Sequence, residues 1–340
     1  MQQTYLKISL IFLILITLNS CENDRYKVDL AGIESNIEII RLEDDLGRLE
    51  IDGFESEIEM LQSTEPIIVE VLIEQVIRAG KASSPNYNVL KRFFLDSNFA
   101  IVANDVAAKY ASIEKVENEL NSAFRYFQYY YPYDTVPTKA YTLISGFGVP
   151  GFTYENILGI SLEWYMGKGY EYYHSQVFPK YMQRRMNENY IVPQVMKAHF
   201  TDMYPFDKNT DGTLLSEIIY WGKQLEFTKM TMPNVHDSII IEYTAKNLQW
   251  CIENEGMIYS HFVDRNLWYS TDQNETYRYV SDGPYTIAPE VPIESAPRMG
   301  WYLGWKIVRN YLNNQKGDPV EILFDNTDYQ KIFKEARYKP

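Results

Sequence analysis

Helical spacing of apolar residues dominates the chain. From residue 66 to about residue 132, apolar side chains recur every three or four positions, which is typical of amphipathic helices. The clearest of these helices carries an apolar stripe of Ile113, Val116, Leu120, Phe124 and Phe127. Ser112 suits its N-cap, and Pro132 its end. The same spacing predicts further helices at residues 193–200, 213–229, 244–263 and 297–312.

Three short runs have the composition of strands. Residues 36–42 (NIEIIRL), 140–145 and 157–162 are predicted to form strands, and a turn rich in Gly and Pro at 146–151 joins the last two. No internal repeat, long linker or low-complexity block divides the sequence. The pattern therefore predicts one α+β domain, mainly α, with a small β-sheet.

The first twenty residues predict a signal peptide. Lys7 precedes an apolar run at residues 8–18, which is shorter than the roughly 18–20 residues of a membrane-spanning helix. The run ends in Leu18-Asn19-Ser20-Cys21, which resembles a bacterial lipobox. We therefore expect cleavage before Cys21 and a lipid on its thiol; a plain secretory signal is the alternative. The predicted organisation is a signal peptide at 1–20, a tether at 21–32 and a domain at 33–340.

A lipid on Cys21 would set the location of the protein. Nothing later in the sequence is apolar enough to cross a bilayer, so acyl chains alone would hold the domain at a membrane. The expected location is the cell envelope, outside the cytoplasm, at either the inner or the outer membrane.

Charge and aromatic content narrow the classes of partner. The 340 residues include 32 basic and 46 acidic side chains, a formal net charge of −14, so nucleic acid is not an expected partner. Tyr, Phe and Trp make up 15% of the chain, which suits a well-filled core and leaves open a glycan-binding surface. Cys251, alone once Cys21 is acylated, is expected to be a buried structural thiol.

One segment resembles a catalytic frame without its metal ligands. Residues 213–227 are apolar around most of a helix, and within them Ser216-Glu217-Ile218-Ile219-Tyr220 aligns with the zinc-protease pattern H-E-x-x-H. Glu217 occupies the position of the general base, but both histidines are missing. Its other interpretation is a buried carboxylate bonded to neighbours. Glu255 lies on the next long helix, on an expected inward stripe of Leu248, Ile252, Tyr259 and Phe262. We expect neither catalytic zinc nor any other cofactor.

Two other segments have distinctive chemistry. Asp207, Asn209 and Asp211, followed by Gly212, match the first half of a calcium loop, but the twelfth position is Ile218 where a bidentate Glu is needed. A polar turn before a helix is the alternative. In the predicted helix 297–312, Gly300 and Gly304 lie one turn apart, which predicts close approach by another element.

An ordered series of motifs resembles one known family. The motifs are YYYP at 129–132, ILGISLE at 157–163, YMGK at 165–168, FPKY at 178–181, IYWGK at 219–223, Trp250 with NE at 254–255, YSTD at 269–272, the 297–312 stretch and YKP at 338–340. Behind a lipobox, this series resembles the gliding motility lipoprotein GldB family of Bacteroidetes. The likeness runs from about residue 33 to the end of the chain.

The resemblance implies both a fold and a role. The family is distantly similar to predicted zinc-dependent peptidases, which implies a zincin-like single domain. Ser216 and Tyr220 would then replace the histidines, and Glu217 and Glu255 would fall at the base and third-ligand positions. The resemblance implies a role in surface motility at the cell envelope. Because the catalytic frame lacks both histidines, we expect a non-enzymatic, membrane-anchored accessory that binds other gliding or secretion proteins of the envelope. The alternatives are a metallopeptidase with an atypical metal site and a glycan-binding lipoprotein.

Overall fold

The computed structural model describes residues 24–81, 86–174, 176–209 and 211–340. The predicted signal peptide and Cys21 therefore lie outside the described residues. Within the described ranges, no helix combines the length and the apolarity needed to cross a bilayer.

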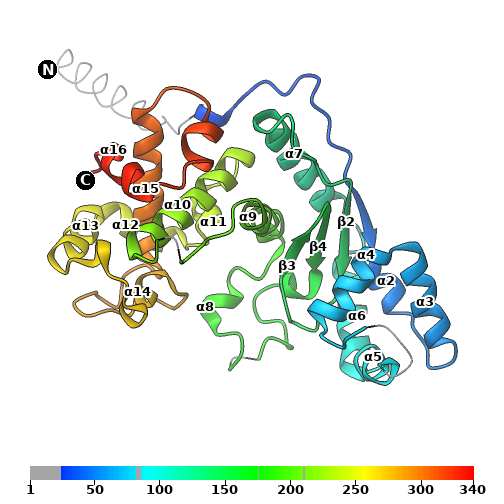
Figure 1. Cartoon of the computed structure of the whole chain (residues 1–340). Coiled ribbons are helices and arrows are strands. Elements are labelled where there is room, and N and C mark those ends of the chain that lie inside the picture. The colour runs from blue at the N-terminus through cyan, green and yellow to red at the C-terminus, as the bar shows by residue number, and fades with distance from the viewer. Residues whose placement is uncertain (1–23, 82–85, 175, 210) are drawn as a thin grey trace, which may run out of the picture.

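A four-stranded sheet forms one side of the described fold (Figure 1). Its order is β1 (Glu38–Arg41), β2 (Lys139–Leu143), β4 (Ile157–Ser161) and β3 (Gly151–Tyr154). The first three strands are parallel, and β3 pairs antiparallel with β4 at the edge. All five residues of β4 are buried, which agrees with the apolar run that predicted it.

The sequence pattern missed β3. Gly151–Tyr154 begins inside the segment predicted as a turn, and its four residues give no alternating signal. Its partner decides its conformation, because Thr153 and Tyr154 pair with Leu158 and Ile157 of the buried strand β4. The polypeptide thus runs from β2 through β3 before it enters β4.

The N-terminal helices lie around the sheet. They are α2 (Leu42–Leu46), α3 (Phe54–Thr64), α4 (Pro66–Glu70), the π-helical η3 (Val71–Val76), α5 (Tyr87–Phe94), α6 (Ser97–Lys109) and α7 (Glu114–Tyr130). The predicted stripe on α7 is confirmed, since Val116, Leu120, Phe124 and Phe127 are buried. Its N-cap is Ile113 rather than Ser112, whose hydroxyl still accepts from the amide of Glu114 at 3.4 Å.

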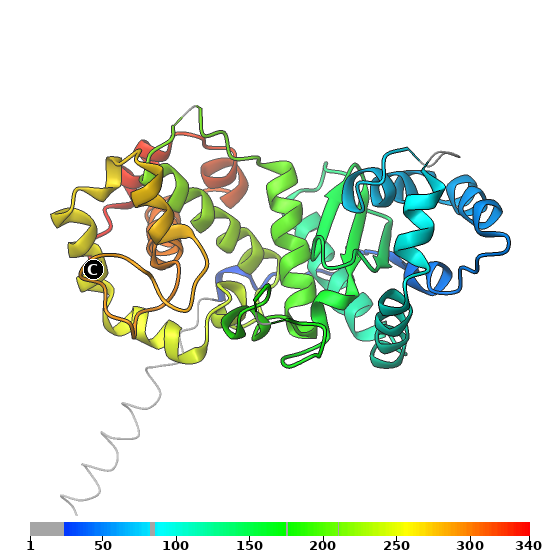
Figure 2. The ribbon, with the colours of Figure 1, turned by 90° about the horizontal axis from the view of Figure 1, so that it is seen from below.

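Most of the remaining helices form a second lobe, and α9 runs between that lobe and the sheet (Figure 2). The remaining helices are α8 (Lys180–Gln183), α9 (Ile191–Met203), α10 (Leu214–Thr231), α11 (Asp237–Ile240), α12 (Ala245–Glu253), α13 (Glu255–Asp264), α14 (Gln273–Val280), α15 (Met299–Asn314), the π-helical η7 (Val320–Phe324) and α16 (Tyr329–Ala336). The described chain is mainly helical with a small sheet, as the sequence predicts.

The predicted helix at 244–263 is two helices. Asn254 leaves the helical conformation, with φ −112° and ψ 17°, and its side-chain amide donates to the carbonyl of Trp250 at 2.8 Å. The break changes which face points inward. Cys251 and Ile258 are fully buried, whereas Ile252, expected on the inward stripe, is 53% exposed. That part of the predicted stripe was wrong, and the prediction of a buried Cys251 is confirmed.

Two glycines bring α10 and α15 into backbone contact. A Cβ atom placed on Gly304 would lie 1.8 Å from the carbonyl oxygen of Ile218, and one on Gly222 would lie 2.4 Å from the carbonyl oxygen of Gly304. Any larger residue would force these helices apart. The prediction that the glycines of residues 297–312 permit close packing is confirmed.

The segment predicted as a tether packs on the domain where it is described. Residues 24–26 form the short helix η2 (Asp24–Tyr26), and Tyr26 is 4% exposed. Its hydroxyl donates to Glu226 at 2.7 Å, and Arg25 donates to the carbonyl of Leu312 at 3.2 Å. The folded domain therefore starts at about residue 25 rather than residue 33, because a buried tyrosine fixes this stretch in place.

Candidate functional site

The residues of the predicted catalytic frame have different surroundings. The hydroxyl of Ser216 is buried and donates to the carbonyls of Asp211 and Thr213, at 2.6 and 2.7 Å, within the N-terminal turn of α10. The ring of Tyr220 is buried among aromatic side chains, with Phe206 at 4.8 Å and Trp221 at 5.2 Å between ring centroids. Both side chains thus contribute to the stability of the helix and core.

Glu217 lies at the surface of an otherwise buried helix. Within α10, Glu217 and Trp221 are half-buried and every other residue is buried. Glu217 lines a pocket together with Phe206, Lys208 and Tyr277. Glu217 is therefore not the buried carboxylate of the alternative interpretation, because it is half-buried at the edge of an otherwise buried helix.

Glu255 is held at the start of α13 by three donors. The hydroxyls of Tyr302 and Tyr338 each donate to its carboxylate at 2.7 Å, and the ammonium of Lys306 lies at 3.3 Å. Burial and the adjacent carboxylate raise the pKa of both tyrosines, so their hydroxyls stay protonated and donate. Among the described residues, no hydrogen bond or ion pair links Glu255 to Ser216, Glu217 or Tyr220. Instead, α15 packs against both α10 and α13.

The described residues contain no metal centre. No group of three or more His, Cys, Asp and Glu side chains in these ranges could hold a metal ion. In the predicted calcium loop, Asp207 accepts from the amide of Asn209 at 2.8 Å, and Asp211 accepts from the amide and hydroxyl of Thr213 at 3.1 and 2.7 Å. Burial alone would raise the pKa of Asp211, but these hydrogen bonds outweigh it and lower the pKa. These contacts favour the polar-turn interpretation.

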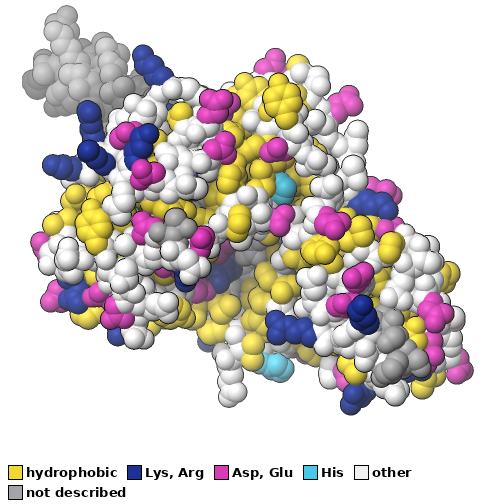
Figure 3. All heavy atoms as spheres, viewed as in Figure 1, with side chains coloured by type: hydrophobic (Ala, Val, Ile, Leu, Met, Phe, Trp, Pro, Cys, Tyr) yellow, Lys and Arg dark blue, Asp and Glu magenta, His cyan; other side chains and the backbone are white. Residues whose placement is uncertain are grey.

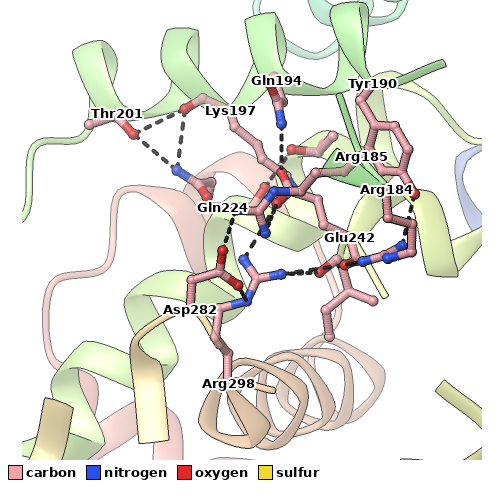
Figure 4. Close-up of polar contacts among 12 residues, drawn as sticks. Arg184, Arg185, Tyr190, Gln194, Lys197, Thr201, Gln224, Glu242, Asp282 and Arg298 are labelled. Atoms are coloured by element: carbon pink, nitrogen blue, oxygen red, sulfur yellow. Dashed lines mark hydrogen bonds and ion pairs between the residues drawn. The ribbon is translucent and has the colours of Figure 1, made fainter. Parts of the chain in front are cut away.

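The most concentrated charged site is a buried cluster around Glu242 (Figure 4). Lys197, from α9, lies 2.8 Å from its carboxylate, and Arg185 and Arg298 each lie at 3.4 Å. Arg184 donates to the backbone carbonyl of Glu242 at 2.5 Å. Lys197 lies on α9, and both Arg184 and Arg185 lie in the segment before α9. Glu242 follows α11, and Arg298 directly precedes α15. The cluster therefore joins α9 and the segment before it to the ends of α11 and α15.

Electrostatics fix the charge states within this cluster. Burial alone would raise the pKa of Glu242, but Lys197, Arg185 and Arg298 outweigh it and hold the pKa far below its ordinary value. Asp282 pairs with Arg185 and with Arg298, and thus supplies a second carboxylate at the more exposed edge. Three cations therefore pair with two carboxylates, and Arg184 binds the backbone carbonyl of Glu242. Figure 3 shows a recess between the two lobes in which basic and acidic side chains are visible.

Backbone strain marks the two central members of the cluster. Glu242 has φ 61° and Arg298 has φ 47°, both in the left-handed region that side chains seldom adopt. The guanidinium of Arg298 also stacks on Trp301, 4.3 Å from its ring centroid, and Trp301 stacks on Trp221 at 4.6 Å. The ion pairs and this stack hold both residues in strained conformations.

Sequence reasoning missed this cluster. The available signal was a single carboxylate, Glu242, after three isoleucines at 239–241, and a single lysine, Lys197, within an apolar helix. A lone charge in an apolar run requires a partner, because an unpaired buried charge is costly. The partners themselves lie 45 to 58 positions away and have no sequence signal.

A second buried carboxylate lies at the carboxyl ends of β2 and β4. Glu163 is fully buried, and its Oε1 accepts from the hydroxyl of Ser145 at 2.6 Å and from the amides of Ser145 and Phe147 at 2.8 and 3.0 Å. Burial raises the pKa of Glu163 to about 7, although these hydrogen bonds oppose the rise. The contacts fasten the Gly-rich loop after β2 to the sheet.

The geometry defines a mainly helical α+β protein in which the carboxylates of Glu242 and Glu255 are occupied by cations and hydroxyls from other elements. The family model described as "Gliding motility protein GldB" matches residues 23–340, and the chain belongs to this family. No curated protein and no solved structure matches the chain. The protein is thus associated with gliding motility, as the motif series predicts. A zincin-like relationship remains a prediction.

Proposed function

We propose that this protein is a lipid-anchored, non-enzymatic accessory of the gliding machinery, which acts by binding another protein of the cell envelope. The family match supports the pathway, and the Leu18–Cys21 motif supports an anchor on Cys21 at a membrane outside the cytoplasm. An anchor at the membrane raises the local concentration of the domain near membrane-embedded partners.

The proposal that the protein is not an enzyme rests on one observation: three donors already occupy the carboxylate of Glu255. A carboxylate that receives two tyrosine hydroxyls and a lysine ammonium is already satisfied, which leaves it poorly suited to bind a metal ion. Ser216, at a position where a zinc peptidase has histidine, donates to the backbone of its own helix. These contacts support a structural use of the frame.

A motility assay with matched variants tests the proposal. Three strains each express one variant in place of the wild-type protein: Glu217→Gln, Glu217→Gln with Glu255→Gln, or Cys21→Ala. Immunoblots check that each variant is abundant. We expect the carboxylate variants to spread normally and Cys21→Ala to stop spreading, with that variant found in the soluble fraction. Crosslinking in the wild-type strain should capture an envelope protein that the Cys21→Ala strain does not yield.

Three results would contradict parts of this proposal. Loss of spreading in Glu217→Gln, with the protein folded and abundant, would mean that the carboxylate does chemistry. Stoichiometric zinc in the purified domain, lost in Glu255→Ala, would favour the metallopeptidase alternative. Binding to a glycan array that disappears when exposed tyrosines are replaced would instead favour a glycan-binding lipoprotein.

A further inference from the structure

The folded domain begins within four residues of the proposed lipid. Tyr26 is buried, and Arg25 donates to α15, so the chain is fixed to the domain from residue 25 onward. Four extended residues span at most about 14 Å. A folded chain of this length has a radius of gyration of roughly 20 Å. The spacer is therefore shorter than the radius of the domain, and faces far from Tyr26 cannot turn toward the membrane that holds Cys21.

The contacts of Tyr26 with Glu226 and Tyr130, here called the latch, hold the start of the described chain on the domain. Glu226 on α10 accepts from the Tyr26 hydroxyl at 2.7 Å, from the Trp305 indole at 2.6 Å and from Arg309 at 3.0 Å. The ring of Tyr26 meets Tyr130 edge to face, with centroids 6.1 Å apart. Because the latch joins η2 to α7, α10 and α15 together, the position of the chain entry is fixed relative to the whole domain.

The face around the chain entry is aromatic. Arg25 and Tyr26 line a groove with Tyr129 and Tyr130 from the end of α7, with Leu312 of α15, and with residues 315, 317, 319 and 322 beyond α15. Tyr129 is 41% exposed, and Tyr133, in the loop that follows α7, is 98% exposed. Figure 1 shows η2, in dark blue, beside the upper ends of α15 and η7. Exposed tyrosines suit the headgroup region of a bilayer, where the ring contacts apolar chains and the hydroxyl contacts water.

The charges of this face are mixed. Exposed Arg25, Lys27 and Lys316 lie among Asp29 and Asp318, whereas the whole chain has a net charge of −14. Figure 3 shows Lys and Arg side chains gathered on the side of the molecule from which the chain enters. An anionic leaflet repels an acidic surface, and cations near the entry point offset that repulsion.

We propose that this face, made of the groove around Arg25 and Tyr26 with the exposed Tyr129 and Tyr133, rests on the headgroups of the membrane that carries the Cys21 lipid. The inference depends on the anchor of the proposed function. It adds an orientation: the end with η2 and the end of α7 meets the membrane. The opposite end, with α3, points away from it, as Figures 1 and 2 both place α3 far from η2.

Lipid-borne quenching measures this orientation directly. The acylated full-length protein is purified, its acyl mass on Cys21 is verified, and it is reconstituted into vesicles of phosphatidylethanolamine and phosphatidylglycerol that contain a nitroxide-labelled lipid. Single fluorophores are attached at Lys316→Cys, Tyr133→Cys or Met60→Cys, the last on α3 and exposed in the wild type. Cys251 is fully buried, so we expect it to stay unlabelled. A labelling reaction on the protein without an added cysteine checks this.

We expect fluorophores at positions 316 and 133 to be quenched at least threefold more than one at position 60. Equal quenching at all three positions, or stronger quenching at 60, would overturn the proposed orientation while leaving the anchor intact. Absence of the acyl mass, or failure to float with the vesicles, would instead contradict the anchor and the orientation with it. Both labels on the aromatic face lie outside the core, so neither variant should impair folding.

Discussion

At the scale of single residues, buried and half-buried carboxylates join distant parts of the chain. Glu226, Glu242 and Glu255 each accept from donors on at least two other segments. Removal of one partner from a buried charge pair typically costs more than the pair contributes, because the remaining charge is left in an apolar environment. The carboxylate with the most cationic partners should therefore be the most sensitive to substitution.

We expect Glu242→Gln to lower the free energy of unfolding by about 3–5 kcal/mol at pH 7, since Lys197, Arg185 and Arg298 would lose their central partner. Urea unfolding followed by circular dichroism measures this change. Glu217→Gln is the matched control, because this half-buried side chain lies at the edge of α10 and should tolerate the change with little effect. Equal stability of the two variants would contradict a stabilising role for the cluster.

The lowered pKa of Glu242 predicts how the stability difference between wild type and Glu242→Gln depends on pH. Because the pKa of Glu242 is lowered in the folded state, its contribution is fully present above its ordinary value of 4.5 and is lost as the pH falls below it. The difference in stability between wild type and Glu242→Gln should therefore narrow as the pH falls from 5 to 3. Unfolding curves at pH 7, 5, 4 and 3 check the sign.

At the scale of elements, the contact between α10 and α15 organises the second lobe. Gly304→Ala would place a methyl group 1.8 Å from the carbonyl oxygen of Ile218, so we expect a loss of about 3 kcal/mol or more, or failure to fold. Gly256→Ala on α13 is the control, since nothing lies within 4 Å of its added methyl group, and alanine favours a helix by about 1 kcal/mol over glycine. Thermal unfolding should separate the two variants in opposite directions.

At the scale of the whole molecule, the first described residues behave as part of the core. Tyr26→Ala removes a ring that is 4% exposed and a hydrogen bond to Glu226, and we expect a loss of about 3–5 kcal/mol. Tyr133→Ala, at a 98% exposed ring, should leave the unfolding midpoint unchanged. If Tyr26→Ala has no effect, this segment is a free spacer and the proposed orientation loses its basis.

The sequence by itself determined the features that depend on local periodicity. Regular spacing of apolar residues located α7, α10 and α15, and continuous apolar runs located β2 and β4, because a helix or a buried strand repeats its environment every few residues. The glycines of α15 were also readable, since glycine inside a helix is costly without a packing reason. The ordered motifs were sufficient to predict the family to which the chain belongs.

Only the tertiary structure decided which residues meet. The partners of Glu242 lie 45 to 58 residues before it and 56 after it, the edge strand β3 takes its conformation from β4, and Ile252 faces outward on α12. The surroundings of Glu217 and Glu255 could not be predicted either, because helical spacing describes positions along one helix and not the elements that pack against it. Contacts between distant segments depend on how whole elements pack, and this packing has no local pattern in the sequence.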